Sequence, residues 1–371
     1  MPGLSERCRQ LTEARAENAW LAEGSVIVQQ QAIRDHDQAM ANFFAGTHRR
    51  PRWRKTGRDE GFRIVQLKAG GVRRVGRHWG QVRIPKVGWV RFRWSRPVPE
   101  GVKSFRVTRD RAGRWHVAFA ATPDPVEAPG NGTVAGIDRG VTVSAALSTG
   151  EMLTVPGLTP GEQRRIRKLE RRLARAGRGS GRRSRTKTAL AKLRVRETDR
   201  RKDWCEKLST RLAREFDLIR VENLHITSMI RSAKGTVDAP GRNVKAKAGL
   251  NRGIRRSGWG LLVRRLEDKA PGRVERVDPA LTSQRCSACG LVDPESRESQ
   301  AVFRCTACNF KLNADVNAAR NIAAGHAVTA RGGLGITWPA NREPQPPLQL
   351  VQRRESPGFR PGGCQEPYSQ N

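Results

Sequence analysis

Four cysteines in the last third of the chain have the spacing of a metal site. They form two CxxC pairs separated by fifteen residues, Cys286, Cys289, Cys305 and Cys308. Each CxxC turn can direct two thiolates at one tetrahedral ion, so this spacing predicts a zinc site. A redox pair is the alternative, but one CxxC motif would serve for that. Because four thiolates close the coordination shell, we expect the zinc to be structural and catalysis to lie elsewhere.

Three carboxylates stand where strands are expected to end or a helix to begin. Asp138 closes the run TVAGID, Glu222 closes FDLIRVE, and Asp315 lies in the helical pattern ADVNAARNI. Taken singly, a turn residue, a solvated strand end and a helix N-cap explain them as well. Taken together in a basic chain, they suggest a site where carboxylate oxygens hold two Mg²⁺ ions about 4 Å apart, which act on a phosphodiester.

The charge of the chain indicates a polyanionic partner. Its 371 residues include 71 Lys and Arg against 35 Asp and Glu, a net charge of +36. Nucleic acid is the expected partner. A membrane surface is the weaker alternative, because the sequence has no apolar run near about 18 residues and no signal-peptide pattern at its start. We therefore expect a soluble, cytoplasmic protein with two or three domains.

The elements before these motifs are expected to be helices followed by antiparallel strands. Apolar residues at three- and four-residue spacing predict helices from Ser5 to about Phe44, broken at Gly24 and Ser25. Alternating runs such as QVRIPKVGWVRFRW and RWHVAFAA predict strands up to a Pro- and Gly-rich linker at 121–132. Arginines alternate with tryptophans there, so one face could contact phosphates, although packed Trp and solvated Arg are the simpler interpretation of any single residue.

The elements around the carboxylates predict an α/β domain with a basic helical hairpin. Residues 161–214 hold 21 Lys and Arg against 6 Asp and Glu, with leucines at helical spacing. We expect two helices joined by AGRGSGRRS. Such a run usually forms a solvated face. Here, however, the excess positive charges would repel one another unless a polyanion lay along the helices. The candidate nucleic-acid contacts are Arg164, Arg165, Arg171, Arg172, Arg182, Arg183 and Arg185.

These motifs also carry a family resemblance. GIDRGV, VENL and TSQRCSACG through FRCTACNFKLNADVNAARNI resemble the three split RuvC motifs and inserted zinc ribbon of the transposon-encoded TnpB (OrfB) proteins, relatives of the type V CRISPR effector nucleases. The resemblance runs from about residue 10 to residue 325. It implies a ribonuclease H-like (RuvC) α/β domain at 126–281 with the hairpin 161–214 inserted, a zinc ribbon at 282–311 and the last RuvC helix at 312–327. Before these we expect a helical recognition segment at 1–48 and an antiparallel β-barrel-like wedge domain at 49–125, so that the whole is an α+β multidomain chain. The tail at 328–371 is expected to be disordered, because it is rich in Pro, Gln and Arg without periodicity.

The resemblance further implies an RNA-guided DNA endonuclease that cuts double-stranded DNA beside a short adjacent motif. Asp138, Glu222 and Asp315 would be its catalytic residues and hold two Mg²⁺ ions, and the loop from Ser228 to Gly258 would cover the site. The hairpin and the strand domain would hold the guide RNA, transcribed from the transposon end, and its heteroduplex with DNA. The implied setting is a prokaryotic cytoplasm, near the nucleoid and away from membranes, with a monomer or homodimer on one RNA.

Two features depart from the family pattern. Family chains generally begin with an additional strand, whereas this sequence begins MPGLSERCRQ, and Asn313 stands where relatives often carry another aspartate. The alternatives are an RNA-guided DNA-binding protein without cleavage, a truncated and decaying copy, or a plain zinc-ribbon DNA-binding protein. The presence of all three carboxylates favours the nuclease.

Overall fold

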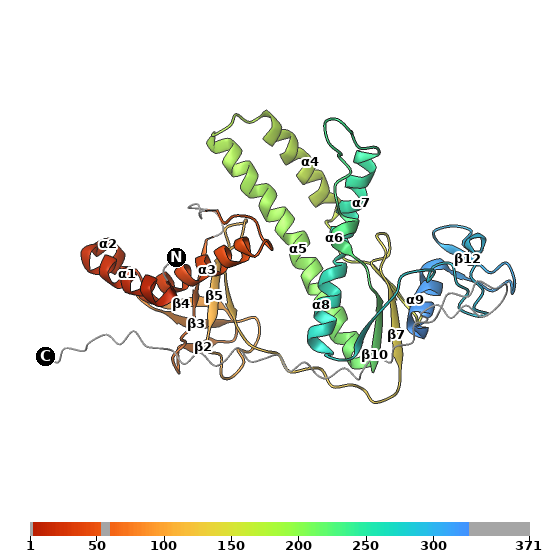
Figure 1. The fold of residues 1–371 in the computed structure, drawn as a ribbon, viewed down its shortest axis with the longest axis horizontal. Helices are drawn as coiled ribbons and strands as arrows, with labels where there is room; N and C mark the ends of the chain where they lie inside the picture. Colours follow the sequence, from red (N-terminus) through yellow and green to blue (C-terminus); the bar gives the residue numbers. More distant parts are fainter. Residues whose placement is uncertain (1–2, 53–59, 326–371) are drawn as a thin grey trace. The chain divides into compact units, whose positions relative to one another are not determined.

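The computed structural model describes residues 3–52 and 60–325 (Figure 1). The tail predicted to be disordered, 328–371, lies outside these ranges. Within them, no helix is both long and apolar enough to cross a membrane.

The N-terminal segment is helical, as its periodicity predicts. Helices α1 (Leu4–Glu17), α2 (Ala19–Ala22) and α3 (Val26–Phe44) follow one another, and α3 begins directly after the predicted break at Gly24 and Ser25. Arg15 fixes this corner by donating to the carbonyl oxygens of Leu21 and Gly24, both at 2.9 Å.

The strands that follow form two open antiparallel sheets. One has the order β1-β5-β6 and the other β2-β3-β4. The expected barrel-like domain is wrong in this respect, because three strands are too few to close a sheet on itself. The two sheets instead share one core, to which Ile64, Val82 and Phe105 contribute. The strands are β1 (Gly61–Ile64), β2 (Val72–Gly76), β3 (Trp79–Ile84), β4 (Gly88–Arg93), β5 (Phe105–Arg109) and β6 (Trp115–Phe119).

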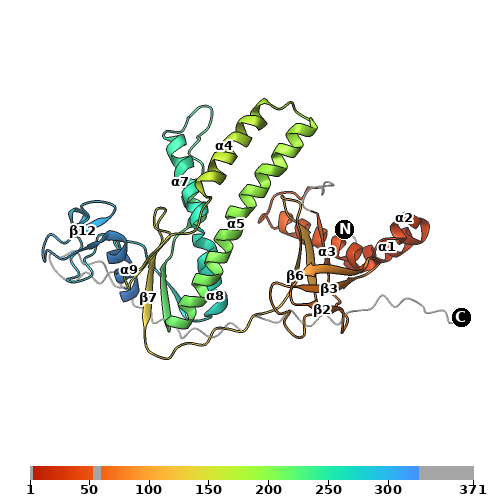
Figure 2. The same cartoon turned by 180° about the vertical axis from the view of Figure 1, so that it is seen from behind.

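A five-stranded mixed sheet organises the rest of the described chain. Its order is β11-β10-β7-β8-β9, with β11, β10 and β7 parallel and β8 and β9 antiparallel. Helices α5 and α8 cover one face and α9 the other (Figures 1 and 2). The strands are β7 (Val134–Asp138), β8 (Ala145–Leu147), β9 (Met152–Leu153), β10 (Leu218–Glu222) and β11 (Val274–Val277).

The basic hairpin consists of α4 (Pro160–Arg175) and α5 (Gly181–Glu215), as predicted. A capping box between Thr159 and Glu162 begins α4. The Ser180 side chain accepts a hydrogen bond from the Arg183 amide and begins α5, so this helix starts inside the predicted linker. The apolar side of α5 then enters the core of the sheet through Leu208 and Leu212.

The segment from Ser228 to Gly258 is less of a loop than its composition predicted. After the short α6 (Ile226–Met229), its second half forms α7 (Val244–Ser257), which leads into α8 (Trp259–Lys269). The loop prediction is wrong here because Asn251 and Ile254 are buried and pack α7 against the rest of the domain. The Asn251 side-chain amide donates to the carbonyl oxygen of Ile230 at 3.0 Å.

The cysteine motifs lie in a small unit between β11 and the last helix. It contains the 3₁₀ turn Pro294–Ser296 and the antiparallel pair β12 (Val302–Arg304) and β13 (Lys311–Asn313), and it runs directly into α9 (Ala314–Ala324).

Candidate functional site

The four cysteines meet as their spacing predicts. The Sγ atoms of Cys286 and Cys308 are 3.8 Å apart, those of Cys289 and Cys305 3.5 Å, and all four lie within 4.8 Å of one another. Tetrahedral zinc with bonds of about 2.3 Å requires sulfur atoms about 3.8 Å apart. The cluster could therefore hold a zinc ion with little change of geometry.

Each CxxC turn is closed by a residue in the left-handed region. Gly290 has φ +82° and Asn309 has φ +57°. The Gly290 amide donates to the Cys286 carbonyl at 2.9 Å, and the Asn309 amide donates to the Cys305 carbonyl at 3.0 Å. Glycine and asparagine tolerate this conformation better than other residues, which explains the matched sequences CSACG and CTACN.

Asp138 and Glu222 end neighbouring parallel strands. Ile137 of β7 pairs with Val221 of β10, so the next residue of each strand reaches the same edge of the sheet. Side chains alternate along a strand. Since Ile137 and Val221 enter the core beneath α5 and α8, Asp138 and Glu222 face the other side, which α9 covers.

Gly136 allows α9 to approach that side closely. A Cβ atom at this position would lie 2.0 Å from the Ala319 carbonyl oxygen and 2.4 Å from the Ala323 nitrogen. Ala319 and Ala323 follow Asp315 at four-residue intervals and therefore share its face of the helix. The close contact thus brings Asp315 over the sheet edge that carries the other two carboxylates.

Asn313, not Asp315, is the N-cap of α9. Its side-chain oxygen accepts hydrogen bonds from the amides of Asp315 at 3.0 Å and Val316 at 3.3 Å. The helix-cap explanation of Asp315 is therefore wrong, and its carboxylate is left for another role. The departure from the family pattern at Asn313 fits this capping function.

The pKa values of the three carboxylates are all raised, and the charges of two of them act on the third. Burial raises the pKa of Asp138 to about 7, and the charges of Glu222 and Asp315 add to this effect. Burial also raises the pKa of Glu222, against a hydrogen bond from Thr282 and the charge of Arg139. The pKa of Asp315 is raised by burial and held down in part by Arg297. A bound cation would relieve this repulsion.

Two asparagines connect this site to the cysteine unit. Asn317 and Asn321, both buried on α9, donate to the Arg285 carbonyl oxygen at 2.7 Å. Asn321 also donates to the Thr282 carbonyl at 2.9 Å, and the Thr282 hydroxyl donates to Glu222 Oε1 at 2.8 Å. Sequence reasoning missed these residues. The available signal was two asparagines one turn apart in an otherwise small and apolar helix.

Arg297 brings a positive charge from the cysteine unit to the carboxylates. Its Nη2 lies 3.9 Å from Asp315 Oδ1. Nothing in the sequence distinguished it from the other arginines of this basic chain.

The candidate arginines of the hairpin differ in exposure. Arg183 is half-buried and donates to the carbonyl oxygens of Leu173 at 2.7 Å and Ala176 at 3.1 Å, so it caps the end of α4. The other candidates are exposed. A hollow of about 420 Å³ lies among basic side chains at the tip of the hairpin, namely Lys168, Arg171, Arg172, Arg175 and Arg182.

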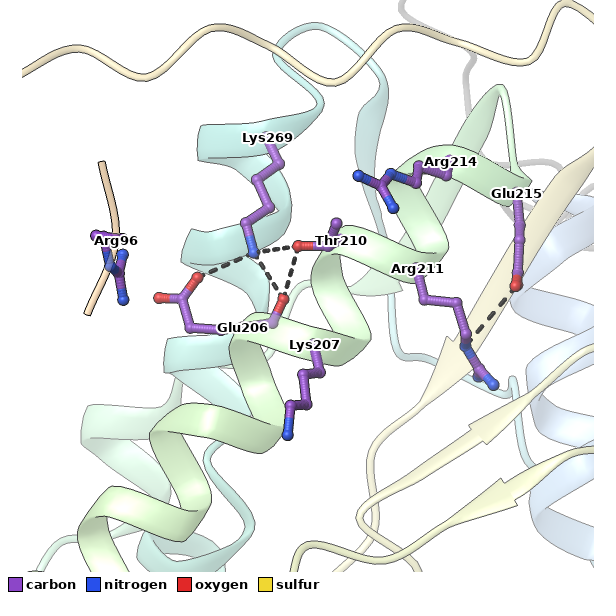
Figure 3. A pocket seen from close by; sticks show the side chains of 8 residues that line it. All are labelled: Arg96, Glu206, Lys207, Thr210, Arg211, Arg214, Glu215 and Lys269. Carbon is purple, nitrogen blue, oxygen red and sulfur yellow. Dashed lines mark hydrogen bonds and ion pairs between the residues drawn. The ribbon is translucent and has the colours of Figure 1, made fainter. Parts of the chain in front are cut away.

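A larger pocket, of about 720 Å³, lies along the end of α5 (Figure 3). Lys269 of α8 donates there to the Glu206 carbonyl oxygen at 2.7 Å and to the Thr210 hydroxyl at 2.8 Å. Its ammonium also pairs with the Glu206 carboxylate at 2.9 Å. None of the three carboxylates lines this pocket. Its polar groups join α5 to α8, so we interpret it as structural.

Two family models match the chain. The OrfB_IS605 model, described as "Probable transposase", matches residues 116–233. The model of the Cas12f1-like TNB domain matches residues 259–322, which include the four cysteines and Asp315.

The chain is similar over most of its length to proteins whose names describe RNA-guided DNA endonucleases. One, InsQ of Escherichia coli (strain K12), is 36% identical over 342 residues, covering 90% of this chain and 83% of InsQ. Another, from Streptomyces pristinaespiralis, is 34% identical over 326 residues, covering 85% of this chain and 75% of the relative.

Shorter or more distant similarities concern Cas12f1. The CRISPR-associated endodeoxyribonuclease Cas12f1 of Sulfoacidibacillus thermotolerans is 54% identical over 56 residues, which are 15% of this chain and 13% of that protein. A solved Cas12f1–sgRNA–target DNA complex matches with a TM-score of 0.47 and 15% identity, covering 80% of this chain and 70% of the Cas12f1 chain.

Proposed function

Because this chain belongs to the TnpB (OrfB) family of transposon-encoded RNA-guided DNA endonucleases, we propose that it cuts DNA phosphodiester bonds with Asp138, Glu222 and Asp315. The observation that carries the assignment of the residues is their convergence on one edge of the five-stranded sheet, where burial and, after it, the charges of Glu222 and Asp315 raise the pKa of Asp138 to about 7. Three partly buried carboxylates repel one another, and in a chain with a net charge of +36 their grouping is best explained by cations that bind between them.

The donor set fits Mg²⁺, which prefers hard oxygen ligands from carboxylates. Two such ions would activate a water molecule and stabilise the leaving oxygen of the phosphodiester. The chain itself supplies the orientation of the ligands. Thr282 holds Glu222 through a hydrogen bond of 2.8 Å, and the Asn313 cap fixes the first turn of α9 beneath Asp315.

The cysteine cluster has a different role in this proposal. Four thiolates leave no open coordination position, so its zinc would not act on substrate. It would instead stabilise the unit that holds Thr282, Arg285 and Arg297 against α9.

Guide RNA and double-stranded target DNA are the proposed partners. The exposed arginines of the hairpin 161–214, which has 21 basic and 6 acidic residues, would bind their backbones. In this proposal the sheet domain of 126–281, the ribbon of 282–311 and the helix α9 form the nuclease unit.

The test is cleavage by the protein purified with RNA co-expressed from its own locus. Plasmids with randomised flanks next to the target would be cut by the unmodified protein and not by Asp138→Ala. The matched control is Asp203→Ala, because Asp203 is an exposed carboxylate on α5 whose ion pair is with Lys207. Cleavage by Asp138→Ala would overturn the assignment. If the unmodified complex binds its target without cutting, the alternative of a guided binding protein holds.

A further inference from the structure

A small pocket lies beside Glu222, and the catalytic proposal does not use it. Its volume is about 220 Å³, and residues of α6, α8 and the ends of β10 and β11 line it. Five of its lining residues are ionisable, namely Arg139, Arg264, Arg276, Glu222 and Glu267.

Arg139 is the buried cation of this pocket. It follows the end of β7 directly and lines the pocket together with Val263 and Glu267 of α8, so its side chain lies on the α8 side of the sheet. The residue is 5% exposed, one terminal nitrogen donates to the Glu222 carbonyl oxygen, and Nε has no hydrogen-bond partner. A guanidinium stays charged in proteins, and buried donors are almost always satisfied. A free buried donor that lines a pocket therefore indicates a missing acceptor.

The remaining charges also favour an anion. Arg264 is exposed on α8, and its side chain forms no hydrogen bond or ion pair with any residue in 3–52 or 60–325. Arg276 pairs with Glu267 at 2.7 Å, so these two charges offset each other. The Glu222 carboxylate faces the α9 side, where Thr282 donates to it. Arg264 thus remains a cation without a carboxylate partner among the described residues. Arg139 interacts with the charges of Glu222 and Asp138 but keeps an Nε–H that no acceptor binds.

We propose that this pocket binds a backbone phosphate of the DNA strand that is cut, next to the phosphate at the carboxylates. The inference rests on the proposed function for the identity of the strand. The carboxylates lie on one face of the sheet edge and the arginines on the other, and both flank the ends of β7 and β10. A strand that crosses this edge would present one phosphate to the metal ligands and a neighbouring one to Arg139 and Arg264. Guanidinium groups suit this contact because they donate to phosphate in a fork.

Arg264→Ala is the primary variant, since Arg139 also holds the Glu222 carbonyl and its loss could disturb the fold. The matched control is Arg320→Ala, because Arg320 is exposed on α9, lies outside the pocket, and has no ion pair with the described residues. The guide RNA complex would be tested in single-turnover cleavage of targets carrying one uncharged methylphosphonate at each position around the cut.

We expect one flanking position at which the methylphosphonate slows the unmodified complex about tenfold, the scale of one charge-assisted hydrogen bond. Arg264→Ala should be about tenfold slower on normal DNA and show no further loss at that position. Arg320→Ala should behave like the unmodified complex. The phosphate assignment would be overturned if the methylphosphonate slowed Arg264→Ala by a further tenfold. It would also be overturned if Arg264→Ala cut normal DNA as fast as the unmodified complex.

A second measurement separates this proposal from the nuclease assignment. Hydroxyl-radical footprinting of target bound to the Asp138→Ala complex needs no cleavage. We expect one nucleotide to be protected in the Asp138→Ala complex and to become reactive in the double variant with Arg264→Ala, but not in the double variant with Arg320→Ala. This result would support phosphate binding in the pocket even if no cleavage is observed. Identical footprints in the three complexes would contradict it.

Discussion

The cysteine cluster and the carboxylate cluster are both sets of metal ligands, but the chain builds them in opposite ways. The cysteines lie within the segment 286–308, and two short turns bring them together. The carboxylates are spread from 138 to 315 and meet only because β7, β10 and α9 pack together. The first site depends on local backbone geometry, whereas the second depends on the whole domain. Four variants or conditions can test this contrast.

Removal of one carboxylate should have the largest effect. Asp315→Asn keeps the size of the side chain and the Asn313 cap, but removes a charged ligand. We expect cleavage to fall by roughly 10³-fold or more, since metal ligation supplies several kcal/mol of transition-state stabilisation. RNA binding should be unchanged in a filter-binding assay. A rate near that of the unmodified complex would remove Asp315 from the site.

Loss of the zinc site should act on the carboxylates at a distance. Cys305→Ser should lower the zinc content and slow cleavage by roughly 10- to 100-fold, the range for residues that orient metal ligands. Zinc analysis, RNA binding and cleavage would be measured on one preparation. Unaltered cleavage in a zinc-free protein would show that the two clusters are independent.

Gly136→Ala tests the contact that assembles the carboxylates. The added methyl group meets the α9 backbone at 2.0 Å, so the helix must shift. Overpacking of this kind costs about 1 to 3 kcal/mol, and we expect a lower Tm together with slower cleavage. Gly157→Ala is the control, because no atom lies within 4 Å of its Cβ position. Equal Tm values for the two variants would contradict the close approach.

The pH dependence of stability should give the smallest effect. Without metal, the pKa of Asp138 is about 7 in the folded protein, against an ordinary value of 3.8. The folded state therefore keeps a proton that the unfolded state releases between these values, and this contribution to stability is lost as pH rises through about 7. In EDTA, the Tm of the unmodified protein should fall relative to that of Asp138→Asn between pH 5 and pH 8. A constant difference would argue against the raised pKa.

The same contrast explains what sequence reasoning could predict. Cysteine spacing identified the first site because its geometry is local. The positions of Asp138, Glu222 and Asp315 followed from the strand and helix patterns and the family resemblance, but their ligand geometry did not. Thr282, Asn317 and Asn321 connect elements that are far apart in the chain, and such contacts produce little periodicity in the sequence. Strand patterns likewise predicted strands without showing that they form two open sheets.

Other features that the sequence did not reveal have local physical causes. The segment containing α7 is rich in glycine and basic residues, so its composition resembles a loop, yet Asn251 and Ile254 are buried against neighbours. Arg183 belongs to a run of arginines with similar sequence surroundings, and only the end of α4 distinguishes it as a cap. Composition gives the average behaviour of a segment, whereas tertiary contacts decide individual residues.

The position of α9 in the chain has a consequence for biosynthesis. The face of β7 that receives Ala319 and Ala323 is translated well before the helix that covers it. A nascent chain can therefore form the basic hairpin α4–α5 before the third carboxylate has left the ribosome. The carboxylate cluster would be completed only when α9 packs onto β7.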